Sequence, residues 1–126
     1  MSSMTTKQTT VIVVDDDPDT AELLCEFLEI KGIRVLGKGY DGKQAVELYQ
    51  KLNPDIVFID VMMPNFDGFY GLEQIRKLDP MAKIIMVTAD LTADTSRLLD
   101  ELKATDVIYK PYEFNQVMAV IEKLRQ

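Results

Sequence analysis

Short apolar runs alternate along the chain with longer segments in which apolar residues recur at helical spacing. The runs cover residues 11–14, 34–39, 56–59, 84–87 and 107–109, and the helical segments cover 18–32, 43–52, 69–78, 92–102 and 113–125. Strands that alternate with helices favour a parallel sheet, because each helix returns the chain to the same edge of the sheet. The sequence therefore predicts five strand–helix units in a single α/β domain, which suits a length of 126 residues.

Charged residues follow three of these runs at the point where each run ends. Asp15, Asp16 and Asp17 follow the first run, Asp60 follows the third, and Lys110 follows the last. In an open parallel sheet, the carboxyl ends of neighbouring strands line one crevice in which ligands bind. Clustered carboxylates repel one another and favour a hard divalent cation, and a lysine beside them indicates that an anion such as a phosphoryl group also binds. Taken singly, each residue has an ordinary explanation as a helix cap, a turn residue or a solvated loop residue, so the hypothesis depends on the joint pattern.

The composition narrows the range of functions. The net charge of −7 argues against nucleic-acid binding by this chain alone, because a phosphate backbone requires a basic face. The absence of histidine excludes a histidine base, a histidine zinc site and a phosphohistidine carried by this chain. The single cysteine, Cys25, allows no intrachain disulfide, which is compatible with the cytoplasm. No apolar run approaches the ~18 residues of a membrane span, and residues 1–9 are expected to form a disordered tail before a domain over 10–126.

Four stretches of the chain carry a resemblance to a known family, and they cover residues 11–18, 55–68, 85–89 and 110–112. The first contains the three consecutive aspartates, the second contains Asp60, the third ends in Thr88-Ala89 and the fourth begins with Lys110-Pro111. Together they resemble the CheY-like receiver domains of two-component response regulators, from about Val11 to the C-terminus. The resemblance implies a flavodoxin-like fold, with a doubly wound parallel sheet in the strand order 2-1-3-4-5.

The resemblance also implies how the domain handles a phosphoryl group. Asp60 would accept that group as a carboxylate nucleophile. The ammonium of Lys110 and the hydroxyl of Thr88 would each bind a phosphoryl oxygen, and a cis peptide bond before Pro111 would direct the lysine into the pocket. Such a domain is a phosphoacceptor for signalling rather than an enzyme, although it assists its own phosphorylation and slow dephosphorylation.

A magnesium site is implied by the same resemblance. Asp16 and Asp60 would bind Mg²⁺ directly, and Asp15 would bind it through a water molecule. The main-chain carbonyl of Met62 would be a further ligand, so the methionine side chain at that position is no obstacle. Mg²⁺ would offset the repulsion between the acidic pocket and an incoming phosphoryl group.

Two features depart from the family pattern. The family usually has an aromatic residue three positions before the lysine, and here that position is Val107. Tyr109, one residue before the lysine, is expected to face the other side of the strand. The Gly-Ala that usually precedes the last strand is kept only in part, as Lys103-Ala104. Asp90 occupies a position that tunes hydrolysis in the family, where its carboxylate could hold an attacking water.

The resemblance implies protein partners. A sensor histidine kinase or a histidine phosphotransfer protein would supply the phosphoryl group, and a downstream protein target would respond to it. The polar segment 92–102 is expected to face such a partner, which could be a second copy in a homodimer that depends on phosphorylation. Because Val107 has no ring to turn inward, the surface change on activation is expected to be smaller or differently placed. Neither direct nucleic-acid binding nor membrane insertion is expected.

Other functions compete with this interpretation. A phosphatase with an aspartyl nucleophile, as in the haloacid-dehalogenase-like family, needs a second acid two residues after Asp60, where Met62 stands. A calcium loop over 15–26 lacks the required glycine, since Thr20 occupies that position. A flavodoxin-like flavin protein needs a hydroxyl-rich phosphate loop after the first strand, whereas three aspartates there would repel a phosphate. A pseudo-receiver that only binds partners remains open, although such modules typically lose the acid pocket or the acceptor.

Overall fold

The computed structural model describes residues 7–125, in which five strands and five helices alternate as the sequence predicts. Their ends lie within two residues of the predicted ends. The elements are β1 (Thr10–Val14), α1 (Pro18–Ile30), β2 (Arg34–Gly39), α2 (Gly42–Leu52), β3 (Ile56–Asp60), α3 (Gly68–Leu78), β4 (Lys83–Thr88), α4 (Ala93–Glu101), β5 (Asp106–Tyr109) and α5 (Phe114–Arg125). The predicted disordered tail falls mostly on residues 1–6, which lie outside the described residues.

The five strands form one parallel sheet in the order β2-β1-β3-β4-β5, which confirms the predicted flavodoxin-like topology. The chain adds strands in one direction from β1 to β2 and in the other from β1 to β3, so the strand order reverses beside β1. The register places Val14 of β1 beside Ile59 of β3, and Asp60 of β3 beside Val87 of β4. The carboxyl ends of these three strands are therefore level along one edge, where a doubly wound sheet binds its ligands.

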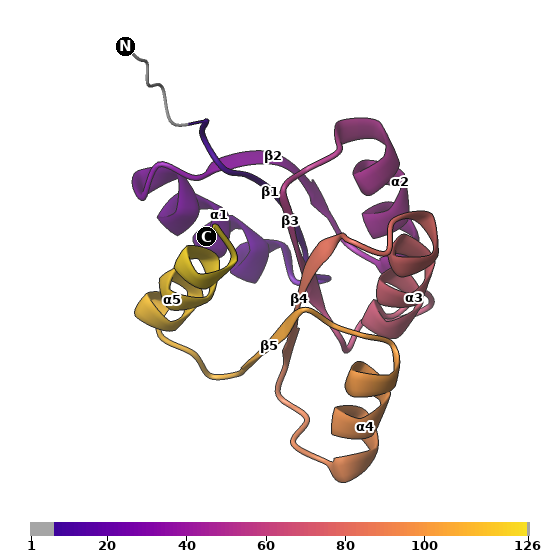
Figure 1. The fold of residues 1–126 in the computed structure, drawn as a ribbon. Helices are drawn as coiled ribbons and strands as arrows, with labels where there is room; N and C mark the ends of the chain where they lie inside the picture. The colour runs from indigo at the N-terminus through magenta and orange to yellow at the C-terminus, as the bar shows by residue number, and fades with distance from the viewer. Residues whose placement is uncertain (1–6, 126) are drawn as a thin grey trace.

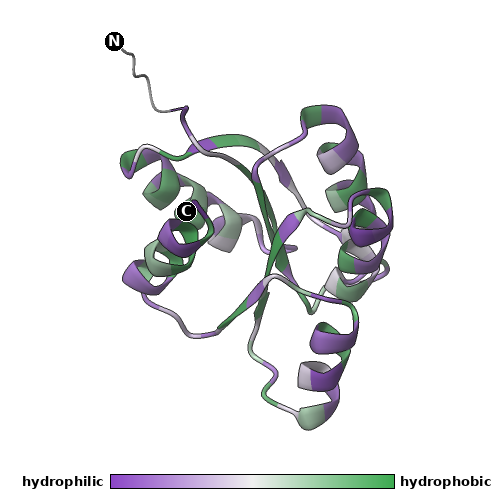
Figure 2. Ribbon diagram, in the orientation of Figure 1, coloured by the Kyte–Doolittle hydropathy of each residue, from purple (hydrophilic) through white to green (hydrophobic). Residues whose placement is uncertain are grey.

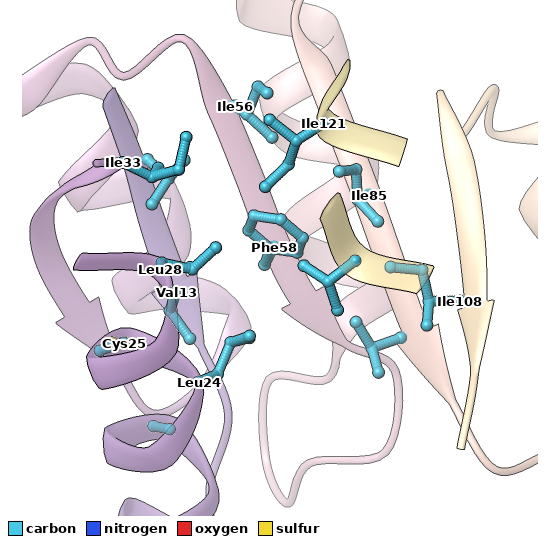
Figure 3. Packing of buried hydrophobic residues seen from close by; sticks show 14 residues of the cluster. Val13, Leu24, Cys25, Leu28, Ile33, Ile56, Phe58, Ile85, Ile108 and Ile121 are labelled. Carbon is cyan, nitrogen blue, oxygen red and sulfur yellow. The ribbon is translucent and has the colours of Figure 1, made fainter. Parts of the chain in front are cut away.

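Helices cover both faces of the sheet, with α1 and α5 on one face and α2, α3 and α4 on the other (Figure 1). Each face has its own apolar cluster, because successive side chains of a strand point to opposite faces. In β3, for example, Phe58 packs in the first cluster and Ile59 in the second. Figure 3 shows the first cluster, in which Phe58 lies between Leu28 of α1 and Ile121 of α5. All five residues of β3 are buried, as its continuous apolar run predicts.

The apolar residues gather in the strands and on the helix surfaces that face them, while the outer helix surfaces are mostly hydrophilic (Figure 2). Each helix therefore has one apolar face, as expected for a helix packed on a sheet. Among the described residues, none of the helices combines the length and the apolar character that a membrane crossing would require.

The segment 15–26 is the end of a strand followed by a helix. Asp17 caps α1, because its carboxylate accepts hydrogen bonds from the main-chain N–H of Asp19 at 3.2 Å and from the hydroxyl of Thr20 at 2.6 Å. Pro18 occupies the first turn, where no N–H is required. Glu26, which a calcium loop would use as its last ligand, lies within α1. The calcium-loop interpretation is therefore wrong.

Candidate phosphoacceptor site

Three carboxylates meet where β1 and β3 end. Asp60 is the last residue of β3. Asp15 and Asp16 directly follow β1, which is the strand paired with β3. Oxygen atoms of the three side chains lie within 4.8 Å of one another. Asp15 and Asp60 are buried, at 7% and 6% exposure, whereas Asp16 is exposed. The structure thus brings together the three acids that the sequence predicts for one site.

Lys110 places an ammonium group against two of these acids. Its Nζ lies 3.2 Å from Oδ2 of Asp60 and 3.5 Å from Oδ2 of Asp15. Burial lowers the pKa of Lys110, but the attraction of Asp60 and Asp15 outweighs that effect and leaves the pKa above its ordinary value. The ammonium therefore stays charged at neutral pH. The peptide bond between Lys110 and Pro111 is cis, as the resemblance implies.

The negative charge of Asp15 is only partly offset by its surroundings. Burial raises the pKa of Asp15 above its ordinary value, and the neighbouring charges of Asp60 and Asp16 add to the rise. The main-chain N–H of Asp17, which donates to Oδ1 of Asp15 at 2.9 Å, and the ammonium of Lys110 act in the opposite direction. Three hard oxygen donors with one counter-charge fit a divalent cation such as Mg²⁺. Met62 is 62% exposed, and the ligand role of its main-chain carbonyl stays a prediction.

Thr88 and the loop after it border the same edge. Thr88 is the last residue of β4, the strand adjacent to β3, and it is fully buried. Its hydroxyl oxygen accepts a hydrogen bond from the main-chain N–H of Asp90 at 2.9 Å. The carboxylate of Asp90 accepts hydrogen bonds from the N–H of Thr92 at 2.9 Å and from the hydroxyl of Thr95 at 2.6 Å. Both oxygens of Asp90 are thus engaged by α4 and its N-cap.

Thr95 is the residue at this edge that the sequence analysis missed. It is 8% exposed although it lies in the first turn of a polar helix. The hydroxyls at positions 92 and 95, two and five residues after Asp90, are the signal that could have found it, because Asp and Thr side chains at this spacing satisfy the first turn of a helix.

The expectation that Tyr109 faces away from the position of Val107 is wrong. The two residues are separated by one residue in β5, so their side chains point to the same face of the sheet. Both line a hollow beside α4, together with Leu99. Val107 packs against the apolar cluster under α4, whereas Tyr109 is 41% exposed. The aromatic ring of this strand therefore lies at the surface of the α4 face, two residues after the position of Val107.

A groove runs from this site along α1 and α5. It has a volume of about 440 Å³ and is lined mostly by apolar side chains. Its lining residues are Thr20, Leu23, Leu24, Ala89, Lys110, Pro111, Tyr112 and Phe114. Lys110 lines the groove and its ammonium contacts Asp15 and Asp60, so the groove borders the acidic pocket.

Comparison with known proteins decides the family. The family described as the response regulator receiver domain matches residues 11–122, which is nearly the whole chain. This chain belongs to that family. The receiver domain is the signalling domain of two-component response regulators, as the resemblance predicts. The matched residues include every candidate site residue named from the sequence.

Individual relatives support the same assignment. Protein CcdB of Bacillus subtilis is 38% identical over 116 residues, which is 92% of this chain and 97% of the relative. The chemotaxis protein CheY of Thermotoga maritima is 34% identical over 90% of this chain and 95% of its own length. Some relatives are longer, and the chain spans only 54% of one of them. Among solved structures, the CheX–CheY–BeF3–Mg²⁺ complex from Borrelia burgdorferi matches with a TM-score of 0.87, at 28% identity over 94% of this chain and 90% of the matched chain.

Proposed function

We propose that this receiver, over residues 10–126, accepts a phosphoryl group on Asp60 in a Mg²⁺-dependent reaction and thereby changes a protein-binding surface. The observation that carries the proposal is the position of the Lys110 ammonium, 3.2 Å from Asp60 and 3.5 Å from Asp15. Asp60 is buried at the end of the central strand β3, so the ammonium is held next to the one carboxylate that would carry the phosphoryl group. A phosphoryl group on Asp60 would bring its oxygens to the same ammonium.

The chemistry assigned to each residue follows from its atoms. An oxygen of Asp60 attacks the phosphorus atom, and the bond from phosphorus to the imidazole nitrogen of the donor breaks. After the transfer, the ammonium of Lys110 pairs with a phosphoryl oxygen in place of a carboxylate oxygen, and the hydroxyl of Thr88 donates a hydrogen bond to another phosphoryl oxygen. When bound, Mg²⁺ supplies the positive charge that offsets the repulsion between the carboxylates and the phosphoryl oxygens. Asp15, Asp16, Asp60 and the main-chain carbonyl of Met62 would hold the metal.

The donor would be a sensor histidine kinase or a histidine phosphotransfer protein that docks in the apolar groove beside Lys110. A phosphohistidine must approach Asp60 closely, so its carrier needs a surface next to the pocket. Lys110 lines the groove and also contacts the acids of the pocket, and Leu23 of α1, another lining residue, is 58% exposed. A contiguous apolar groove that is open to solvent is the kind of surface at which a protein binds a partner.

This docking assignment can be tested separately from the chemistry. Leu23→Asp should slow transfer from a phosphorylated histidine phosphotransfer domain that phosphorylates the wild-type chain, while leaving phosphorylation by acetyl phosphate unchanged. Ile30→Asp is a matched control, because Ile30 is also exposed on α1, at 81%, but does not line the groove. Equal slowing by both substitutions, or slowing by neither, would place the donor elsewhere.

The output surface would lie on α4, which is the polar helix that follows the loop after Thr88. A downstream protein, or a second copy in a homodimer that depends on phosphorylation, would bind there. We place the protein in the cytoplasm, where histidine kinases transfer their phosphoryl groups to receivers. Size-exclusion chromatography with light scattering, with and without beryllofluoride, tests the homodimer directly.

Phosphorylation itself is tested by intact-mass spectrometry after incubation with Mg²⁺ and acetyl phosphate. The wild-type chain should gain one phosphoryl group, and Asp60→Asn should gain none. Asp100→Asn is the control, because Asp100 is an exposed acid of α4 and should behave as the wild type. A wild-type chain that gains no phosphoryl group while keeping its fold would favour the pseudo-receiver that acts only by binding.

A further inference from the structure

Thr88 is held by the loop that follows it, and the direction of the hydrogen bond matters. The N–H of Asp90 donates to the hydroxyl oxygen of Thr88 at 2.9 Å. A threonine hydroxyl has two lone pairs and one hydrogen, so accepting this bond leaves the hydrogen available for another acceptor. The bond therefore fixes the side chain in an orientation from which it can still donate. That property is required of a group that binds a phosphoryl oxygen.

The main chain of Asp90 is fixed by its own side chain. One carboxylate oxygen accepts from the N–H of Thr92 at 2.9 Å, and the other accepts from the hydroxyl of Thr95 at 2.6 Å. The hydrogen bond from Thr95 is the main reason that the pKa of Asp90 lies below its ordinary value, so the carboxylate stays ionised. Hydrogen bonds to an ionised acceptor are stronger than those between neutral groups.

Thr95 connects this arrangement to the helix. Only Thr95 and Leu99 of α4 are buried, whereas α1 buries four residues. The two anchors of α4 are thus an apolar contact at Leu99 and a polar one at Thr95. Two hydrogen bonds therefore connect α4 to Thr88 through Asp90. The Thr95 hydroxyl donates to the Asp90 carboxylate, and the Asp90 N–H donates to the Thr88 hydroxyl.

We propose that Asp90 and Thr95 are positioning residues for Thr88, and that they set how well this receiver binds the phosphoryl group. The proposal rests on the function proposed above, in which Thr88 donates to a phosphoryl oxygen. Loss of the Thr95 hydroxyl frees one oxygen of Asp90, loosens the N–H that orients Thr88, and weakens the bond from Thr88 to the phosphoryl oxygen. The three acids of the metal site and Lys110 take no part in these hydrogen bonds, so we expect metal binding to be unaffected.

The test compares two affinities in the same variants. Thr95→Val keeps the shape of the side chain and removes its hydroxyl, and Thr95→Ser restores the hydroxyl. Affinity for Mg²⁺ alone, and affinity for beryllofluoride at saturating Mg²⁺, are measured by amide NMR titration. Thr95→Val should weaken beryllofluoride binding by about threefold to tenfold, as expected for one hydrogen bond, with Mg²⁺ affinity unchanged. Thr95→Ser should bind both as the wild type does.

Other outcomes are also decisive. Beryllofluoride binding by Thr95→Val that equals or exceeds that of the wild type would overturn the proposal, as would an equal loss of Mg²⁺ and beryllofluoride affinity, which would indicate general loosening of the fold. Failure of the wild-type chain itself to bind beryllofluoride would instead refute the proposed function. If Thr95→Val does not fold, Asp90→Asn takes its place and should show the same split between the two affinities. Ser96→Ala, an exposed change in the same helix, should alter neither affinity.

Discussion

Replacing Asp15 by asparagine should stabilise this receiver in the absence of divalent metal. Asp15 is 7% exposed, and burial raises its pKa, so the ionised form costs free energy in the folded state at neutral pH. Asparagine has the same shape and keeps an oxygen that can accept the hydrogen bond from Asp17. The substitution therefore removes a buried charge without opening a cavity.

The size of the effect follows from the distances. With an effective dielectric constant of about 20, Asp60 repels the Asp15 carboxylate by at least ~3.5 kcal/mol, because the two carboxylates lie within 4.8 Å of each other, and Lys110 attracts it by ~5 kcal/mol across 3.5 Å. These two interactions nearly cancel, so the loss of hydration decides the sign, and that loss amounts to several kcal/mol for a fully buried ion. After allowance for the open side of the pocket, we expect Asp15→Asn to be more stable by about 1–2 kcal/mol, or roughly 4–10 °C in Tm.

The pH dependence has a definite sign. Because the pKa of Asp15 is raised in the fold, the folded state holds the proton more tightly, and the wild type loses stability as the pH rises through that pKa. The advantage of Asp15→Asn should therefore be present at pH 7.5 and shrink as the pH falls toward 4. Thermal unfolding of the wild type and of Asp15→Asn, followed by circular dichroism in the presence of a chelator, measures this difference at pH 7.5 and at pH 4.

Magnesium should reverse the order of stability. At a concentration 100 times its Kd, a ligand that binds only the folded state stabilises it by about 2.7 kcal/mol. The wild type should gain this stabilisation, and Asp15→Asn should gain much less because it lacks one acid of the site. If Asp15→Asn is less stable than the wild type without metal, or keeps the full response to Mg²⁺, then the electrostatic account of the pocket is wrong.

Three further predictions concern the rest of the fold. Burial and the 2.6 Å hydrogen bond to Asp79 raise the pKa of Tyr49 to about 12, so wild-type stability should fall between pH 10 and 12, and Tyr49→Phe should lack that part of the fall in alkaline unfolding curves. Lys103 has φ of 64°, so Lys103→Gly should raise the free energy of unfolding in urea by about 0.5–1 kcal/mol, and a loss would contradict this. A Cβ at Gly68 would lie 2.3 Å from the main-chain oxygen of Asp60, so Gly68→Ala should lower the Tm and weaken Mg²⁺ binding together, measured by calorimetry and titration.

The sheet and the acidic pocket could be predicted because both depend on short-range patterns. The run 56–59 is long enough and apolar enough to specify a strand covered on both faces, and all of β3 is buried. Once the strands are parallel, the residues that end them must share an edge, which brings Asp15, Asp60 and Lys110 together without knowledge of any contact.

Other features were missed or wrongly predicted from the sequence, for different reasons. The link from Thr95 to Asp90 depends on how a loop folds back on the next helix, and several loop conformations suit the same residues. The side of the sheet that Tyr109 faces follows from the alternation of side chains along β5 and could have been predicted correctly. Lys103 has a φ of 64°, and this left-handed conformation is not one that a lysine in a sequence pattern would indicate.

The most direct test of the central claim is to identify the residue that carries the phosphoryl group. The wild-type chain is phosphorylated with acetyl phosphate and Mg²⁺ and treated with borohydride, which reduces an aspartyl phosphate to homoserine. Peptide mass spectrometry then locates the change. Homoserine at position 60 alone, absent when acetyl phosphate or Mg²⁺ is omitted, is the predicted result. Homoserine at Asp15 or Asp16 with Asp60 intact would contradict the assignment of Asp60 as the phosphoacceptor.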